Sequence, residues 1–137
     1  LDKVPLFKYC SPSLRNVLLD ALVPQTYPPD GLILQEGDLG GEIFFVSKGE
    51  LEVISGDGEK IYTVFEEGDY FGHLSLLLKE RRTASVRTRT YCEVFILEAN
   101  DFKRIRSDYP EFKEVAKKVS AERTEKTTKL ILEGVVL

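Results

Sequence analysis

The spacing of the hydrophobic residues changes twice along the chain. Between Ser11 and Leu22 they recur at helical spacing, which predicts an amphipathic helix. Ser11 followed by Pro12 supplies an N-cap with proline in the first turn, and the helix is expected to end before Pro24. We therefore predict a leading helical segment over about residues 1–23.

The next part of the sequence predicts strands. Short runs rich in Val, Ile, Phe and Tyr are separated by Gly and Asp, a pattern typical of β-strands joined by turns. The runs are GLILQEG, EIFFVSKG, ELEVISGDG, EKIYTVFEEGD, TASVRTR and CEVFILE. Strands at this spacing predict an antiparallel barrel or jelly roll over about residues 24–99.

After Glu98 the sequence predicts helices again. Asn100 is a suitable N-cap for DFKRIRSDY, and Pro110 opens a long charged run, EFKEVAKKVSAERTEKTTKLILE. We therefore predict two C-terminal helices within residues 100–137, of which the second is long.

One segment, FGHLSLLLKERRTASV at residues 71–86, interrupts the series of strands. Its centre, HLSLLLKE, is too long and too rich in leucine for a turn, so we predict a short helix inserted into the roll. The predicted fold class is therefore mainly β with flanking helices. A single domain, residues 1–137, contains an antiparallel β-roll (jelly roll) with an N-terminal helix, the inserted helix and two C-terminal helices.

The composition is that of an ordinary globular domain, with 42% apolar and 31% charged residues. The net charge is −4 and basic residues alternate with acidic ones, so no large nucleic-acid interface is expected.

Cys10 and Cys92 lie outside any CxxC or Cys/His spacing, which disfavours a disulfide framework or a zinc site and favours a reducing, cytosolic setting. No run reaches the roughly 18–20 apolar residues that span a bilayer, so the domain itself is expected to lie outside the membrane. Because the chain starts without methionine and stops in LILEGVVL, we expect a piece of a longer protein.

The segment 71–86 also carries candidate chemistry for binding an anion. A helix that begins just after Gly72 directs the N–H groups of its first turn toward one point, where the helix dipole favours negative charge. Arg82 can offer a forked, permanently charged donor set to phosphate oxygens, and Thr83 or Ser85 can add a hydroxyl. Together these features predict a phosphate cradle. The alternative is that Gly72 only makes a turn, the leucines only fill core and the two arginines are solvated.

This arrangement resembles the phosphate-binding cassette of the cyclic nucleotide-binding domain family. The resemblance extends over nearly the whole chain, through LDKVPLFKYCSPSLRNVLL, the turn motif PPDGLILQEGD, the strands FFVSKGELEVI, the cassette and the trailing helices. RRTASV followed by TYCEVFIL and YPEF is most similar to the domain of cyclic nucleotide-gated and hyperpolarisation-activated (HCN-like) ion channels. The kinase regulatory subunit usually carries alanine where Thr83 stands.

The resemblance implies which residues of the cassette bind a cyclic nucleotide. Arg82 is implied to pair with the cyclic phosphate, and Thr83 to reach the phosphate or a guanine amino group. The residues implied to contact phosphate or ribose are Phe71, Gly72, His73, Leu74, Ser75, Arg82 and Thr83.

The resemblance also implies a base pocket and a helix that covers it. The base pocket is formed by Val53, Thr63 and Phe65, with Phe65 as plain core as the alternative. The residues implied to cover the base from the last helix are Arg123, Lys126, Thr127 and Lys129. For so charged a helix the alternative is a solvated face with pairs four residues apart, such as Glu122 with Lys126.

His73 departs from the family pattern. The family has a glutamate after Phe-Gly, whose carboxylate accepts hydrogen bonds from the ribose 2′-hydroxyl. A neutral imidazole offers one acceptor nitrogen and no negative charge. Ribose recognition is therefore expected to be weakened or replaced: the domain binds cyclic nucleotides loosely, binds them in an altered pose, or no longer depends on them. PPDG, where the family commonly has PGD, is a smaller departure that shifts a turn.

The function implied is a regulatory module that binds cAMP, cGMP or both and transmits movement of its C-terminal helix to a linked ion channel. Cyclic nucleotide is the expected regulatory ligand, with no other cofactor and no metal. The expected partner is the pore domain of a tetrameric parent channel, with this domain on the cytoplasmic side of the plasma membrane and no nucleic acid bound.

Other functions remain as alternatives. One is a nucleotide-independent structural domain of a voltage-gated potassium channel. Another is the regulatory domain of a kinase regulatory subunit, an exchanger or a transcription regulator, the last of which needs a helix-turn-helix after the long helix. An enzyme is not expected, because neither a Ser/His/acid set nor a metal-ligand set surrounds His73.

Overall fold

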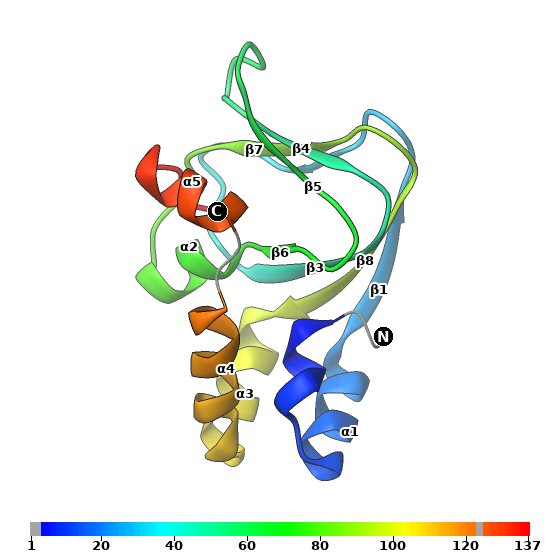
Figure 1. Ribbon diagram of the computed structural model, residues 1–137, viewed down its shortest axis with the longest axis vertical. Helices are drawn as coiled ribbons and strands as arrows, with labels where there is room; N and C mark the ends of the chain where they lie inside the picture. Colours follow the sequence, from blue (N-terminus) through cyan, green and yellow to red (C-terminus); the bar gives the residue numbers. More distant parts are fainter. Residues whose placement is uncertain (1–3, 123–124) are drawn as a thin grey trace.

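The computed structural model describes residues 4–122 and 125–137, and it places a β-roll beside a group of helices (Figure 1). The roll and the inserted helix α2 occupy the upper part of the view, and α1, α3 and α4 lie below. The helices are η1 (Pro5–Tyr9, a 3-10 helix), α1 (Pro12–Ala21), α2 (His73–Leu78), α3 (Ala99–Asp108), α4 (Glu111–Ala121) and α5 (Glu125–Leu132). The strands are β1 (Val23–Tyr27), β2 (Leu32–Leu34), β3 (Glu42–Lys48), β4 (Leu51–Ile54), β5 (Ile61–Phe65), β6 (Tyr70–Phe71), β7 (Ser85–Thr88) and β8 (Cys92–Glu98).

The strands form two antiparallel sheets. One has the order β1-β8-β3-β6 and the other the order β2-β7-β4-β5. The predicted fold class, an antiparallel β-roll with flanking helices and a short inserted helix, is confirmed.

Strand β3 is buried on both faces, which explains why EIFFVSK is almost continuously apolar. Phe44 points into the roll, where its ring stacks on Phe71 with ring centroids 5.0 Å apart. Its neighbours Ile43 and Phe45 point the other way, into the core shared with the helices. Alternate residues of one strand therefore join the two cores of the domain.

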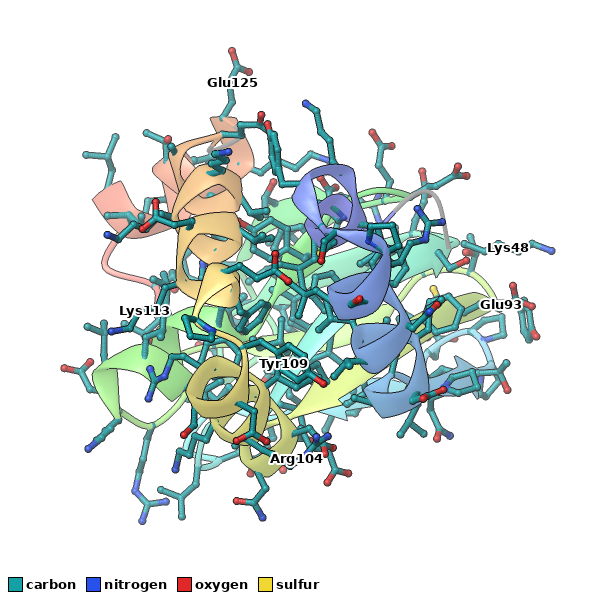
Figure 2. The ribbon with its side chains drawn as sticks, turned by 90° about the horizontal axis from the view of Figure 1, so that it is seen from below. Lys48, Glu93, Arg104, Tyr109, Lys113 and Glu125 are labelled. Atoms are coloured by element: carbon teal, nitrogen blue, oxygen red, sulfur yellow. The ribbon has the colours of Figure 1, made fainter. Side chains whose placement is uncertain are left out.

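The helices α1, α3 and α4 pack with η1 against the outer face of the first sheet (Figures 1 and 2). Leu14 and Leu18 of α1, Ile105 of α3 and Phe112 of α4 are almost completely buried in this cluster. Figure 2 shows the charged Lys113 and Arg104 on the outward side of the same helices. The predicted cap of the leading helix is present, since Ser11 Oγ accepts a hydrogen bond from the N–H of Leu14.

The C-terminal helices differ from the prediction in two details. Helix α3 begins at Ala99 with Glu98 at the N-cap, so Asn100 lies inside the first turn and is not the cap. The long charged run is divided into α4 and α5, and α5 lies against β5 of the roll instead of continuing along the helical cluster. Over residues 4–122 and 125–137, no helix has the length and apolar character needed to cross a membrane.

Candidate ligand-binding site in the roll

The segment 71–86 forms a short helical loop between β6 and β7, as predicted. Gly72 has a left-handed backbone with φ of 98°, and α2 begins at the next residue. A Cβ at this position would lie 2.5 Å from the carbonyl oxygen of Glu42 and 3.1 Å from Arg82 Nη1. Glycine is therefore required both by its φ angle and by this close approach to β3.

Arg82 is the central residue of this loop and is buried, with 1% of its side chain exposed. Its Nη1 donates hydrogen bonds to the carbonyl oxygen of Gly72 at 3.0 Å and to Ser75 Oγ at 2.8 Å. Its Nη2 donates to the carbonyl oxygen of Glu42 at 3.0 Å. The guanidinium thus joins both ends of the loop to β3, and the interpretation of Arg82 as a solvated arginine is wrong.

The charge of Arg82 is shielded from water. Burial lowers the pKa of its guanidinium, while the carboxylates of Glu42 and Asp38 raise it. The Glu42 carboxylate lies 4.0 Å from Nη2 and is itself half exposed. Arginine retains its proton in such surroundings, so a permanent positive charge lies at the first turn of α2. The neighbouring Arg81 is exposed and donates to the carbonyl oxygen of Gly37 at 2.9 Å.

The leucines of α2 fill the core only in part, since Leu76 packs against the helical core cluster while others lie largely at the surface. Leu77 and Leu78 expose 49% and 55% of their surface, and Leu74 and Leu76 are partly exposed. Ser75, by contrast, is 1% exposed. The small polar residue thus faces inward, whereas Leu77 and Leu78 lie largely at the surface.

The C-terminal residues 134–137, which we call the tail, lie against this loop. The N–H of Ser75 donates to the backbone oxygen of Leu137 at 2.8 Å, and the N–H of Thr83 donates to the carbonyl oxygen of Val136 at 2.9 Å. The N–H of Val136 donates in return to Thr83 Oγ1 at 2.7 Å. Sequence reasoning did not predict this contact.

The tail reaches the loop through a tight turn at the end of α5. Gly134 has φ of +74°, its N–H donates to the carbonyl oxygen of Ile131, and the N–H of Val135 donates to that of Leu130. This pair of bonds is a Schellman motif, which reverses the chain after a helix. The glycine directly after the apolar end of a helix is the sequence signal that could have revealed the turn.

The predicted base-pocket residues lie on the inner side of the roll. Val53 and Phe65 are 0% and 2% exposed, and the Phe65 ring stacks on Phe71 with centroids 5.0 Å apart. Thr63 is partly exposed and pairs with Val53 across β4 and β5. The same buried cluster includes three residues of α5 and the tail: Leu130, Val135 and Leu137. A cavity of about 20 Å³ remains among Phe65, Phe71 and these residues.

The residues predicted to cover the base lie on α5, next to the roll. Lys126 Nζ lies 2.8 Å from Asp69 Oδ2, and Lys129 Nζ donates to the carbonyl oxygen of Tyr62 at 2.7 Å. Thr127 borders the small cavity beside Phe65. Arg123 lies outside the described residues. Both lysines therefore contact strands of the roll or the turn before β6.

His73 occupies the first position of α2. Its ring lies 4.9 Å from the ring of Tyr70, centroid to centroid. The residue borders both the small cavity inside the roll and an apolar cavity of about 80 Å³ formed with the helical cluster, including Phe102 and Phe112. It is thus placed between the roll and the helices that follow it.

In the part of the chain that the structure describes, no group of three or more His, Cys, Asp or Glu side chains could hold a metal ion. The donors gathered at the loop are instead the guanidinium of Arg82, two hydroxyls and backbone N–H groups. This set favours an oxygen-rich anion over a cation.

Comparison with known proteins identifies the family of this arrangement. The family model described as "Cyclic nucleotide-binding domain" matches residues 24–109. Cyclic nucleotide-gated channel alpha-4 of Mus musculus is 34% identical over 136 residues, covering 95% of this chain and 24% of the relative. The cyclic nucleotide-gated channel rod photoreceptor subunit alpha of Gallus gallus is 34% identical over 119 residues, covering 82% of this chain and 18% of the relative. A cyclic nucleotide-gated channel of Caenorhabditis elegans is 35% identical over 117 residues, covering 81% of this chain and 16% of the relative. The chain spans about a quarter or less of the length of these relatives.

Proposed function

Because the chain belongs to the cyclic nucleotide-binding domain family, we propose that it is a regulatory module that binds cAMP or cGMP in the β-roll. The observation that carries this proposal is the loop 71–86, where the buried charge of Arg82 lies 2.8 Å from Ser75 Oγ and beneath the start of α2. Few other ligands than a phosphate match a fixed positive charge surrounded by hydroxyl and N–H donors.

In the proposed complex the cyclic phosphate lies at the start of α2. Ser75 and Thr83 supply backbone N–H and hydroxyl groups, and Arg82 pairs with the phosphate while it holds Gly72 in place. Phe71, Gly72, His73 and Leu74 line the sugar side of the same loop. Val53, Thr63 and Phe65 form the wall against which the base lies.

The C-terminal helices provide the moving part of the proposed mechanism. Lys126, Thr127 and Lys129 bring α5 to the roll, and Arg123, which lies outside the described residues, is proposed for the same role from the sequence alone. A ligand shifts such an element only by the difference between its affinities for the two positions. Contacts that α5 makes to a bound nucleotide and not to the empty roll would supply that difference.

We further propose that this movement reaches the pore of a linked ion channel. The support is that the relatives are cyclic nucleotide-gated channels and that this chain matches only a part of each. The domain would then be the cytoplasmic part of a tetrameric plasma-membrane channel. The proposed role needs no catalytic step, no further cofactor and no nucleic acid.

The proposal is tested by isothermal titration of the domain with cAMP and with cGMP. Saturable binding of either nucleotide at a single site per chain is expected, with 5′-AMP, which lacks the cyclic phosphate ester, as the matched control. A folded domain that takes up neither cyclic nucleotide would contradict the proposal.

One observation favours a second function, a structural domain that does not depend on nucleotide. The interior of the roll next to the loop is filled by side chains of α5 and the tail, and only about 20 Å³ remains. His73 in place of the family's glutamate points in the same direction. The two functions are separated by the same titration, since the structural domain gives no saturable heat.

A further inference from the structure

The tail takes up hydrogen-bond donors that the proposed function assigns to the nucleotide. The N–H groups of Ser75 and Thr83 donate to the backbone oxygens of Leu137 and Val136 at 2.8 and 2.9 Å. Thr83 Oγ1 accepts from the N–H of Val136 at 2.7 Å. Backbone oxygens of the tail therefore lie where phosphate oxygens would accept the same two hydrogen bonds.

The tail also fills the apolar part of the same site. Val135 and Leu137 are each 4% exposed and belong to the cluster that contains Val53 and Phe65. The cavity left beside them is about 20 Å³, whereas sites for small organic ligands have volumes of roughly 300–1,000 Å³. A cyclic nucleotide and the docked tail cannot occupy the roll together.

The tail is joined rigidly to α5. The Schellman bonds at Gly134 and Val135 fix the direction in which the chain leaves the helix. Helix α5 is held to the roll by Lys126 and Lys129 on one side and by the docked tail on the other. Withdrawal of the tail therefore removes one of the attachments of α5.

We propose that the tail, residues 134–137, is a built-in peptide occupant of the nucleotide site, which a cyclic nucleotide must displace in order to bind. The inference rests on the proposed function, and it adds that in the absence of nucleotide the site is occupied by the protein's own tail. Nucleotide binds only chains whose tail has left, so the apparent dissociation constant is the intrinsic one divided by the fraction of open chains. Release of the tail then removes one attachment of α5 and frees this helix to make the contacts with a bound nucleotide that the proposed function assigns to it.

The first test compares nucleotide affinity with and without the tail. A chain that ends at Glu133 is expected to bind cAMP about 10- to 100-fold more tightly than the 137-residue chain, because it no longer has to open. Leu137→Ala is expected to tighten cAMP binding as well, but by a smaller factor. Leu132→Ala is the matched control, since Leu132 is 82% exposed and Leu137 is 4% exposed. Equal affinity in all four chains would overturn the inference.

The second test measures the docked tail directly, and its first arm needs neither nucleotide nor a variant. Amide hydrogen exchange of the 137-residue chain, followed by NMR, is expected to show slow exchange at Ser75 and Thr83, and cAMP should change both. A peptide of sequence LILEGVVL added to the chain that ends at Glu133 should restore that protection. Fast exchange at both amides in the nucleotide-free chain would overturn the inference.

These tests separate the inference from the function on which it rests. If neither chain binds nucleotide but the Ser75 and Thr83 amides are protected, the proposed function fails and the docked tail stands. If both chains bind equally and the amides are unprotected, the function stands and the inference fails.

Adding Gly-Ser-Gly after Leu137 should retain the protection, since the peptide oxygen that Leu137 then carries still accepts the hydrogen bond from the Ser75 N–H. Loss of protection in the extended chain would overturn the idea of a peptide occupant.

Discussion

Arg82 Nη1 donates a hydrogen bond to Ser75 Oγ at 2.8 Å, and the same nitrogen donates to the carbonyl oxygen of Gly72. One guanidinium thus holds the first turn of α2, and the proposed function also assigns to it the pairing with the cyclic phosphate. The structural and the ligand-binding contributions of this side chain are therefore expected to change together when it is replaced.

Replacing Arg82 tests both contributions. Arg82→Ala is expected to weaken cyclic nucleotide binding by on the order of 2–5 kcal/mol through loss of a charge-assisted contact. Because the buried acceptors on Gly72, Ser75 and Glu42 lose their donor, the free energy of unfolding should also fall by about 1.5–3 kcal/mol. Titration calorimetry and urea denaturation measure the two effects.

Arg82→Lys is the matched variant for this prediction. It keeps the charge but not the fork that reaches three acceptors, so it should recover part of the affinity and little of the stability. Affinity unchanged in Arg82→Ala would remove this residue from the binding site.

Thr83 is expected to affect the choice between the two nucleotides. Its hydroxyl could reach a guanine amino group as well as the phosphate, so Thr83→Ala should reduce cGMP affinity by about 0.5–1.5 kcal/mol more than cAMP affinity. Thr83→Ser retains the hydroxyl and should preserve the difference between the nucleotides. Equal losses for cAMP and cGMP in the alanine variant would limit Thr83 to the phosphate that both share.

His73 is expected to weaken the contact with ribose. His73→Glu restores the side chain typical of the family and should tighten cAMP binding by about 1–3 kcal/mol, since a carboxylate accepts more hydrogen bonds from the sugar. His73→Gln, which has a similar length and no charge, should give little or no gain. Titration of the three chains at one pH measures the effect, and identical affinities would mean that this position does not face the sugar.

Glu52 is expected to make stability depend on acid pH. Hydrogen bonds from Arg89 at 2.7 Å and Arg87 at 2.9 Å hold the pKa of its carboxyl below the ordinary value. The unfolded chain therefore takes up a proton more readily than the folded one. The stabilisation is complete above about pH 4.3, the ordinary glutamate pKa, and is lost as the pH falls through the lower folded-state pKa.

Glu52→Gln is the variant that measures this contribution. Because both arginines are partly solvated, the loss in unfolding free energy at pH 7 should be only about 0.5–1 kcal/mol, and it should shrink toward zero near pH 3. Glu59→Gln in the exposed turn between β4 and β5 is the control. The difference between its unfolding free energy and that of the native chain should not change with pH in this way. A difference between Glu52→Gln and the native chain that stays constant from pH 7 to pH 3 would contradict the assignment.

The features that the sequence predicted correctly are those that depend on residues close together in the chain. Ser11 and Pro12 mark the start of α1 through local capping, and the leucine-rich run between two strands marks α2. The pairing of Arg82 with a phosphate stays a prediction, and its acceptors within the protein were not predicted, because backbone carbonyl oxygens such as those of Gly72 and Glu42 carry no sequence pattern.

The features that escaped prediction depend on contacts between distant parts of the chain. The hydrogen bonds of Thr83 to Val136 join residues 53 positions apart, and no local pattern specifies that pairing. The division of the last helical run into α4 and α5 is similar, because the run favours helix throughout, whereas the contacts that hold α5 against the roll come from distant residues such as Asp69 and Tyr62.

The order β1-β8-β3-β6 has a consequence for synthesis of the protein. Strand β1 pairs with β8, so Val23 meets its partner Ile96 only after most of the roll has been translated. Leu14 and Leu18 likewise wait for Ile105 and Phe112 before they are covered. During synthesis the leading helix therefore leaves the ribosome with its apolar face exposed to solvent. The domain can close only after the final third of its chain has been translated. Such long-range closure slows folding and makes the nascent chain a natural client for chaperones.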